Sequence, residues 1–224
     1  MHDVVFLLDV DNTLLDNDRV TDDLRTHLAE QFGPAGDLYW KHFEDIRKEL
    51  GYADYLGALQ RYRADFEGDG AAAHRLLTVS GFLVDYPFAD RVYPGALEVI
   101  AKLSGFGPTV ILSDGDVVFQ PRKVNRSGIW KAVEGRVLIF IHKEEMLDVV
   151  EREYPAKQYF MFDDKERILD AMKKSWGDRL VSVFPRQGHY AHDPSNAGMY
   201  AKPDVTVEKI GDLLDMDIAK MVGA

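Results

Sequence analysis

Two aspartates lie two residues apart, directly after an apolar segment near the N-terminus. Val4 to Leu8 is a continuous run of β-branched and large apolar residues, which predicts a strand buried on both faces of a sheet. Because the chain turns where a strand ends, the carboxylates of Asp9 and Asp11 can converge on one pocket. One carboxylate can attack phosphorus, and a second can protonate a leaving oxygen and then deprotonate water. Carboxylate oxygens are also ligands that Mg²⁺ prefers.

Taken alone, this Asp-x-Asp pair has simpler interpretations. A solvated acidic turn after a strand explains the two residues about equally well. A calcium-binding EF-hand loop is excluded, because Thr13 and Leu14 occupy positions where that loop needs Asp or Asn and Gly. The chemical interpretation therefore depends on what lies at the ends of the other strands.

Four further apolar runs also end in polar residues. They cover residues 109–112, 137–141, 159–162 and 180–184, and are followed by Ser113-Asp114, His142-Lys143, Asp163-Asp164 and Pro185-Arg186. Segments with helical periodicity lie between them, at 96–103, 144–150 and 167–172. Strands that alternate with helices predict an α/β fold with a doubly wound parallel sheet, similar to a Rossmann core. Sites in such sheets lie at the carboxyl ends of the strands, where these polar residues occur.

The segment 15–87 has a different pattern. Its apolar residues recur at helical spacing and no strand-like run interrupts them, while glycine-containing breaks fall at 33–36, 51 and 68–70. We therefore expect a catalytic core formed by residues 1–14 and 88–224, with a roughly four-helix cap at 15–87. Most aromatic residues of the cap are expected to pack between helices, with Trp40 or Tyr55 as candidates to line a substrate slot.

The polar residues after the later strands suit a phosphate and a metal ion. Ser113 can donate a hydrogen bond to a phosphoryl oxygen, and Lys143 can neutralise its charge. By themselves these two are better explained as a helix cap and a surface lysine. The adjacent acids Asp163 and Asp164 are costly to place together without a cation, so we expect one to bind metal and one to cap a helix. Lys123 is a rival for the cationic role.

The ordered set of motifs resembles the four motifs of the haloacid dehalogenase-like hydrolase superfamily. Asp-x-Asp, Ser, Lys and Asp-Asp occur in that order, each after a successive apolar strand. The segment from Asp9 to Asp16 is close to the family's first motif, and Pro94-Gly95, 127–130 and 142–147 are similar to family landmarks. The segment 15–87 resembles the family's small helical cap between the first and second motifs.

This resemblance implies a role for each motif residue. Asp9 is the nucleophile, and Asp11 is the general acid and base and supplies a backbone carbonyl to Mg²⁺. Ser113 and Lys143 hold the phosphoryl group. Asp164 binds the metal.

The resemblance also implies roles for three further residues. Asp163 is expected to bind the metal through water. The backbone of Asp114 and Gly115 is expected to support the phosphate. Asn is more usual at position 114, so the carboxylate of Asp114 must point away from a bound dianion.

The expected function is Mg²⁺-dependent hydrolysis of a small phosphate monoester through an aspartyl-phosphate. A phosphomutase and a 2-haloacid dehalogenase on the same core are alternatives, as is a non-catalytic protein that binds a phosphorylated metabolite. Asp11 favours phosphate chemistry over dehalogenation, because a halide needs no proton when it leaves. The complete set of motifs argues against a degenerate, non-catalytic core.

Composition limits the class of protein further. The chain has 27 basic and 38 acidic residues and a formal charge of −11, which argues against nonspecific binding to nucleic acid or to an anionic membrane. It has no cysteine, so thiolate catalysis and cysteine-based zinc sites are excluded. No apolar run approaches the ~20 residues of a membrane span, and no signal peptide is evident, so the cytoplasm is the expected location. Both monomer and homodimer remain open.

Three histidines form a weaker candidate site. His189 and His192 are three residues apart after the fifth predicted strand, with His142 as a third possible ligand. Loop spacing of this kind does not ensure the tetrahedral geometry of a zinc site, so surface residues are the favoured interpretation.

Overall fold

A single parallel sheet forms the centre of the molecule. The computed structural model describes residues 1–196 and 198–223. Its sheet has the strand order β3-β2-β1-β4-β5-β6, and all neighbouring strands are parallel. The strands are β1 (His2–Leu8), β2 (Thr109–Asp114), β3 (Val137–Phe140), β4 (Ala156–Phe162), β5 (Leu180–Pro185) and β6 (Val205–Val207).

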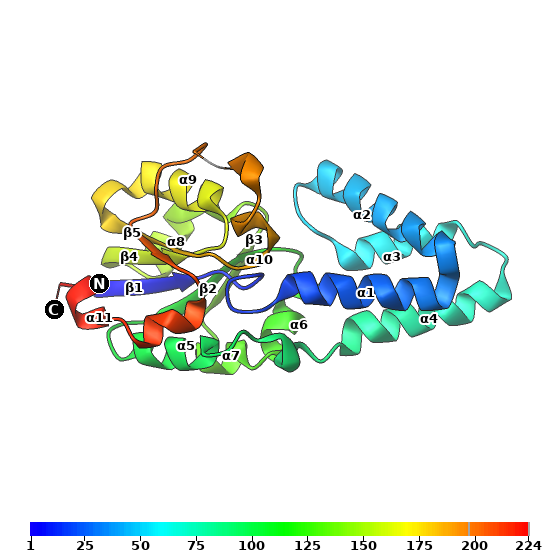
Figure 1. Cartoon of the computed structure of the whole chain (residues 1–224), viewed down its shortest axis with the longest axis horizontal. Coiled ribbons are helices and arrows are strands. Elements are labelled where there is room, and N and C mark those ends of the chain that lie inside the picture. Colours follow the sequence, from blue (N-terminus) through cyan, green and yellow to red (C-terminus); the bar gives the residue numbers. More distant parts are fainter. Residues whose placement is uncertain (197, 224) are drawn as a thin grey trace.

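Helices cover both faces of this sheet (Figure 1). One face carries α5 (Ala96–Ser104), α6 (Phe119–Arg126), α7 (Ile129–Ala132) and α11 (Ile218–Met221), and the other carries α8 (Leu147–Glu153) and α9 (Glu166–Trp176). In β1, Phe6 and Leu8 belong to the apolar cluster of the first face, whereas Val5 and Leu7 belong to that of the second. This burial on both faces is why the strand is a continuous apolar run. The predicted doubly wound parallel sheet is confirmed.

Some elements differ from the sequence prediction. The edge strand β6 and the helices α6 and α7 were not expected. The third strand ends at Phe140, and the helix expected from residue 144 begins at Leu147, after a 3₁₀ turn at Lys143–Glu145.

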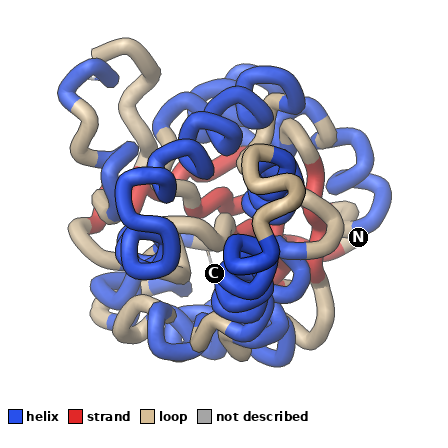
Figure 2. Tube along the Cα trace, turned by 90° about the vertical axis from the view of Figure 1, so that its right-hand side faces the viewer, coloured by secondary structure: helices blue, strands red, loops and turns tan. Residues whose placement is uncertain are grey.

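Four α-helices lie between residues 17 and 85, in the part of the chain that connects β1 to α5. They are α1 (Asn17–Phe32), α2 (Asp37–Leu50), α3 (Tyr55–Ala64) and α4 (Gly70–Asp85), here called the helical insertion. Aspartates before three of these helices, at positions 16, 54 and 69, accept hydrogen bonds from first-turn amides and cap the helix N-termini. Figure 1 shows the insertion extending from one end of the sheet, with both chain termini at the other end, and Figure 2 views the molecule from the insertion side.

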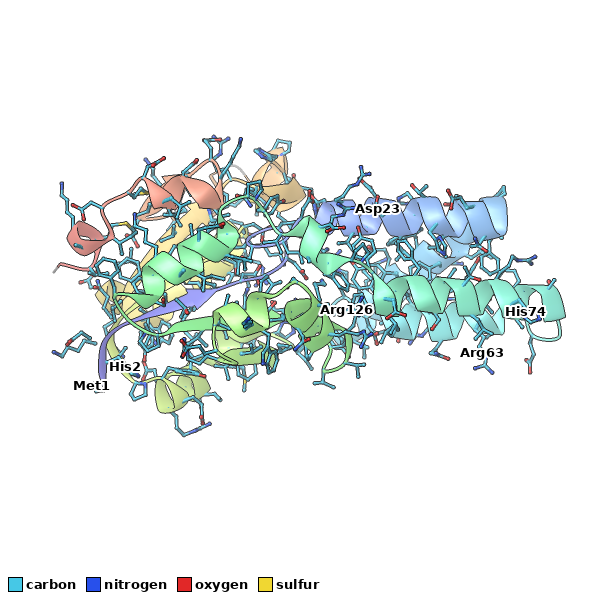
Figure 3. All side chains as sticks on the ribbon, turned by 90° about the horizontal axis from the view of Figure 1, so that it is seen from below. Met1, His2, Asp23, Arg63, His74 and Arg126 are labelled. Atoms are coloured by element: carbon cyan, nitrogen blue, oxygen red, sulfur yellow. The ribbon has the colours of Figure 1, made fainter. Side chains whose placement is uncertain are left out.

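Two neighbouring linkers join the insertion to the rest of the chain. The amide of Asp16 donates to the carbonyl of Arg91 at 2.8 Å, and the amide of Tyr93 donates to Leu14 at 2.9 Å. Figure 3 shows Asp23 and Arg126 near this junction, far from His74 at the distal end. The insertion is therefore attached through a narrow connection beside the carboxyl end of β1.

Candidate active site

Asp9 occupies a central place among the strand ends. In the register of the sheet, Leu8 is opposite Ile111 of β2 and Phe162 of β4, and the amide of Asp9 donates to the carbonyl of Phe162 at 2.9 Å. Ser113, near the carboxyl end of β2, and Asp163, directly after β4, therefore place their polar side chains next to Asp9. The Asp9 side chain is almost fully buried.

Lys143 forms ion pairs with two carboxylates. Its Nζ lies 2.5 Å from Asp9 Oδ1 and 2.6 Å from Asp163 Oδ2, and only 1% of the side chain is exposed. Burial alone would lower the pKa of this lysine, but the negative charges of Asp163, Asp9 and Asp114 outweigh that effect and raise it above the ordinary value. Lys143 is therefore held as a cation beside Asp9.

The adjacent acids after β4 have different surroundings. Asp163 uses Oδ1 to accept a hydrogen bond from the amide of Lys165 at 2.9 Å, and its Oδ2 pairs with Lys143. Burial raises the pKa of Asp163 to about 6, against the opposing effect of Lys143. In contrast, neither side-chain oxygen of the buried Asp164 has a hydrogen-bond donor among the described residues. Burial raises the pKa of Asp164 well above its ordinary value.

This acidic cluster has the composition of a site for a divalent cation. One carboxylate oxygen from each of Asp9, Asp163 and Asp164 lies within 4.8 Å of the others. The two oxygens of Asp164 lack donors, and buried carboxylates without partners are costly. A hard cation would satisfy these oxygens and offset the repulsion between the acids. The residues present therefore fit a metal ion of that class.

Asp11 lies at the edge of this cluster and interacts with α6. Lys123 Nζ is 2.7 Å from Asp11 Oδ1, and Gln120 Nε2 is 3.3 Å from Oδ2. Gln120 Nε2 also donates to Ser113 Oγ at 3.0 Å, while Ser113 Oγ lies 3.4 Å from Asp9 Oδ1. The Asp11 side chain is 28% exposed.

Asp114 and Gly115 are both engaged in backbone interactions. Asp114 Oδ1 accepts a hydrogen bond from the amide of Lys143 at 2.8 Å, so this carboxylate is directed at the turn after β3. Burial raises the pKa of Asp114. The amide of Gly115 donates to the carbonyl of Phe140 at 3.0 Å. It would have to release that carbonyl before it could bind a phosphate.

A cavity of about 500 Å³ lies between the strand ends and the helical insertion. Asp11, Asp114 and Gln120 line it from the strand-end side, and Trp40 and Tyr55 line it from the insertion. The expectation that these two aromatic residues face a cavity is in agreement with this arrangement. A ligand in the cavity would contact both parts of the chain.

The histidines after β5 do not form a metal site with His142. His189 Nδ1 lies 2.5 Å from Asp18 Oδ1, and its amide donates to Asp18 Oδ2 at 2.7 Å. Among residues 1–196 and 198–223, the acidic cluster of Asp9, Asp163 and Asp164 is the metal-ligand grouping that the geometry supports. The interaction of His189 instead connects the helical insertion to the short helix α10 (Gly188–Ala191) after β5.

The family is decided by the sequence of the core together with this arrangement. A sequence model of haloacid dehalogenase-like hydrolases matches residues 4–175, which is most of the chain and includes all four motifs. The chain belongs to the haloacid dehalogenase-like hydrolase family. A crystal structure of a haloacid dehalogenase-like hydrolase from Burkholderia xenovorans LB400 is 63% identical and covers 97% of this chain and 100% of that one, with a TM-score of 0.89.

More distant relatives include both phosphatases and dehalogenases. The trehalose-phosphate phosphatase of Mycobacterium tuberculosis is 32% identical over 111 residues, which are 50% of this chain and 26% of that protein. The chain thus spans about a quarter of the length of this curated relative. L-2-haloacid dehalogenase from Xanthobacter autotrophicus shares the fold at 18% identity, with a TM-score of 0.58 and coverage of 95% of this chain and 97% of that one.

Sequence patterns did not identify all the residues around Asp9 and Asp11. The patterns give no role to Gln120, and they offer Lys123 only as a rival to Lys143. Both lie on α6, one helical turn apart, which is a spacing that places two side chains on the same face. Thr13, whose Oγ1 donates to Asp9 Oδ2 at 3.3 Å and accepts from the amide of Asp164 at 3.1 Å, was also missed.

Proposed function

We propose that this protein is a phosphoric monoester hydrolase that works through an aspartyl-phosphate on Asp9, with Mg²⁺ bound by the acidic cluster. The observation that carries the proposal is the presence of two separate ion pairs near the carboxyl ends of the strands. Lys143 lies beside Asp9, and a second carboxylate, Asp11, lies at the cavity with its own donors. A nucleophile beside a cation, together with a separate acid, suits transfer of a phosphoryl group to Asp9 and then to water.

In the first step, an oxygen of Asp9 attacks phosphorus and the bond from phosphorus to the ester oxygen breaks. Asp11 gives its proton to that oxygen, so an alcohol leaves. Lys143 and the hydroxyl of Ser113 are near enough to Asp9 to interact with the phosphoryl oxygens as charge accumulates there.

In the second step, water attacks phosphorus and the bond from Asp9 to phosphorus breaks. Asp11, now a carboxylate, accepts the proton of the water. Phosphate leaves and both aspartates return to their starting states, so the net reaction is one ester and one water to one alcohol and one phosphate.

The metal belongs to the same proposal. Asp9 and Asp164 would hold Mg²⁺ through carboxylate oxygens, with the backbone carbonyl of Asp11 as a further ligand and Asp163 acting through water. When bound, the ion neutralises phosphoryl charge and orients the phosphate. Asp163 is already engaged by Lys143 and the amide of Lys165, which is consistent with an indirect role.

The helical insertion would act as the cap, comprising residues 15–87 on a core of 1–14 and 88–224. Its residues Trp40 and Tyr55 line the cavity above Asp11. A cap in this position would limit the access of bulk water to the site and select the leaving group. The substrate would thus be a small phosphorylated molecule.

Dehalogenation is the second candidate, because a haloacid dehalogenase shares the fold. The presence of Asp11 at the cavity, held by its own donors, favours phosphate esters. A departing ester oxygen needs a proton, which Asp11 can supply, whereas a departing halide does not. Both activities can be assayed on the purified protein: phosphate release from a panel of phosphate monoesters with Mg²⁺, and halide release from 2-haloacids. Phosphate release that is lost in Asp9→Asn supports the proposal. Halide release without phosphate release contradicts it.

A further inference from the structure

Lys123 is a buried cation whose partners are clear. Its side chain is 1% exposed, and its Nζ lies 2.7 Å from Asp11 Oδ1 and donates to Asn17 Oδ1 at 2.9 Å. A buried ammonium is costly unless it is paired and hydrogen-bonded. The position of Lys123 is therefore coupled to that of Asp11.

Both oxygens of the Asp11 carboxylate are engaged from the same helix. Gln120 approaches Oδ2 at 3.3 Å, and Lys123 approaches Oδ1. Holding a catalytic group in one orientation raises the fraction of encounters in which it can react. α6 thereby fixes the orientation of the Asp11 carboxylate at the cavity.

The same network extends into the helical insertion. Asn17 is the first residue of α1, and its Nδ2 donates to the hydroxyl of Tyr55 in α3 at 3.3 Å. The Tyr55 hydroxyl also lies 3.2 Å from Thr21 Oγ1. A continuous set of polar contacts thus runs from Asp11 through Lys123 and Asn17 to Tyr55.

We infer that Lys123 is a positioning residue for Asp11 and connects it, through Asn17, to the helical insertion. This inference rests on the proposed function, and it adds Lys123 to the residues on which that function depends. As the proton passes from Asp11 to the leaving oxygen, the carboxyl O–H bond breaks, an alcohol O–H bond forms, and negative charge develops on Asp11. An ammonium 2.7 Å from that carboxylate stabilises the developing charge. The contribution of Lys123 to the rate of ester cleavage should therefore be largest for leaving groups that depend most on protonation.

The competing interpretations of Lys123 predict different kinetics. If Lys123 bound phosphate directly, its loss would affect all phosphate esters similarly, because they share the phosphoryl group. If it only stabilised the fold, its loss would reduce stability or the amount of active enzyme, again irrespective of the leaving group. A positioning role through Asp11 predicts dependence on the leaving group.

The test compares wild type, Lys123→Met and Asp11→Asn with an activated aryl phosphate and an alkyl phosphate. The quantity measured is kcat/KM, because it reports steps up to departure of the alcohol and is unaffected by later hydrolysis of the phosphoenzyme. For Lys123→Met we expect kcat/KM to fall about 10- to 100-fold with the alkyl ester and by less than about threefold with the aryl ester. Lys123→Gln, which keeps a hydrogen-bond donor without the charge, provides the same comparison if the methionine variant does not fold.

A double variant separates action through Asp11 from action elsewhere. In the Asp11→Asn background, Lys123→Met should cause no further fall with the alkyl ester. Lys123→Arg should restore part of the activity, because it returns a positive charge to α6. Lys102→Met is the matched control, since this lysine also donates to several acceptors, the carbonyls of Leu213, Leu214 and Met216, but lies outside the site.

The link to the insertion is tested with Asn17→Ala, which should show the same leaving-group dependence as Lys123→Met with a smaller loss. Equal losses with both esters, or an additive loss in the double variant, would overturn the positioning role. Loss confined to Lys123→Met, with Asn17→Ala unchanged, would overturn the link.

If wild type hydrolyses neither ester, the proposed function itself fails. If Asp11→Asn shows the leaving-group dependence and Lys123→Met does not, only this inference fails.

Discussion

Lys143 Nζ and Asp9 Oδ1 lie 2.5 Å apart, although 134 residues separate them in the chain. The same ammonium pairs with Asp163, so one cation offsets two buried acids. Without it, the carboxylates at the ends of β1 and β4 would repel one another and any phosphoryl group brought to Asp9. The parallel arrangement of β1, β3 and β4 is what allows this grouping, because Asp9, Lys143 and Asp163 all follow the carboxyl ends of these strands.

Replacing Lys143 should therefore affect both activity and stability. Lys143→Met is expected to lower kcat/KM for phosphate esters by about 100-fold or more, because phosphoryl charge loses its cation. It should also lower the free energy of unfolding by about 3–5 kcal/mol, since two buried carboxylates lose their partner. Steady-state kinetics and urea denaturation measure the two effects. Lys173→Met is the control, because Lys173 pairs with Asp204 away from the site; an activity loss no larger than in that control would be inconsistent with the assigned role.

Asp164 should determine both metal binding and the stability of the metal-free protein. Its buried oxygens have no donor among the described residues, so Asp164→Asn should raise the melting temperature of the metal-free protein, by the equivalent of about 1–3 kcal/mol. The increase in melting temperature that Mg²⁺ gives the wild type should be lost in this variant. Thermal unfolding with and without Mg²⁺, in a chelator-treated sample, measures both effects.

Asp170→Asn provides the matched control for that experiment. Asp170 is also a buried acid close to the site in sequence, but it pairs with Lys174 at 2.7 Å. Its replacement should leave the Mg²⁺-dependent increase intact. Retention of that increase in Asp164→Asn would rule out Asp164 as a ligand.

The pairing of β5 with β6 should weaken in acid through Asp204. Burial acts in the opposite direction, but hydrogen bonds from Lys173 and Ser182 hold the pKa of Asp204 below its ordinary value of 3.8. Because the pKa of Asp204 is lower in the folded state, its ionised carboxylate adds to the free energy of unfolding above pH about 4. This contribution is lost as the pH falls through the folded-state pKa. At neutral pH, Asp204→Asn should lower the free energy of unfolding by about 1–2 kcal/mol, a modest effect because the carboxylate is partly exposed.

Denaturation of wild type and Asp204→Asn at several pH values tests this dependence. The difference between the two proteins should be constant near neutral pH and shrink below pH about 4. A difference that stays constant into the acid range would show that the charge of Asp204 does not stabilise the sheet edge.

The core of the fold could be predicted because its strands are unambiguous. The runs at 4–8 and 159–162 are buried on both faces and end abruptly in aspartate, so both the strands and their polar carboxyl ends can be predicted. β6 was missed because Val205–Val207 has only three residues, too few to show a pattern. α6 was missed because Pro121 and several charged residues obscure its apolar face, and its start depends on Asp116, whose side chain accepts from the amide of Phe119 at 2.7 Å.

In the candidate site, the residues that directly follow strands could be predicted, whereas those that reach it from a helix could not. Asp9, Ser113, Lys143 and the two acids after β4 follow strands directly, so the parallel topology was enough to group them. Gln120 and Lys123 instead reach Asp11 from a helix, and that contact depends on how α6 packs beside the end of β1. No spacing within the sequence specifies such packing, which is why Lys123 could be considered only as a competing cation.

The proposed function requires that Asp9 becomes covalently phosphorylated during turnover. The most direct measurement is the intact and peptide mass of protein quenched with acid within the first turnover of an activated aryl phosphate, using wild type, Asp11→Asn and Asp9→Asn with Mg²⁺. We expect one added phosphoryl group on the peptide that contains Asp9, greater accumulation in Asp11→Asn because the water loses its base, and none in Asp9→Asn. Turnover without any covalent phosphoryl group, or a phosphoryl group that persists in Asp9→Asn, would contradict it.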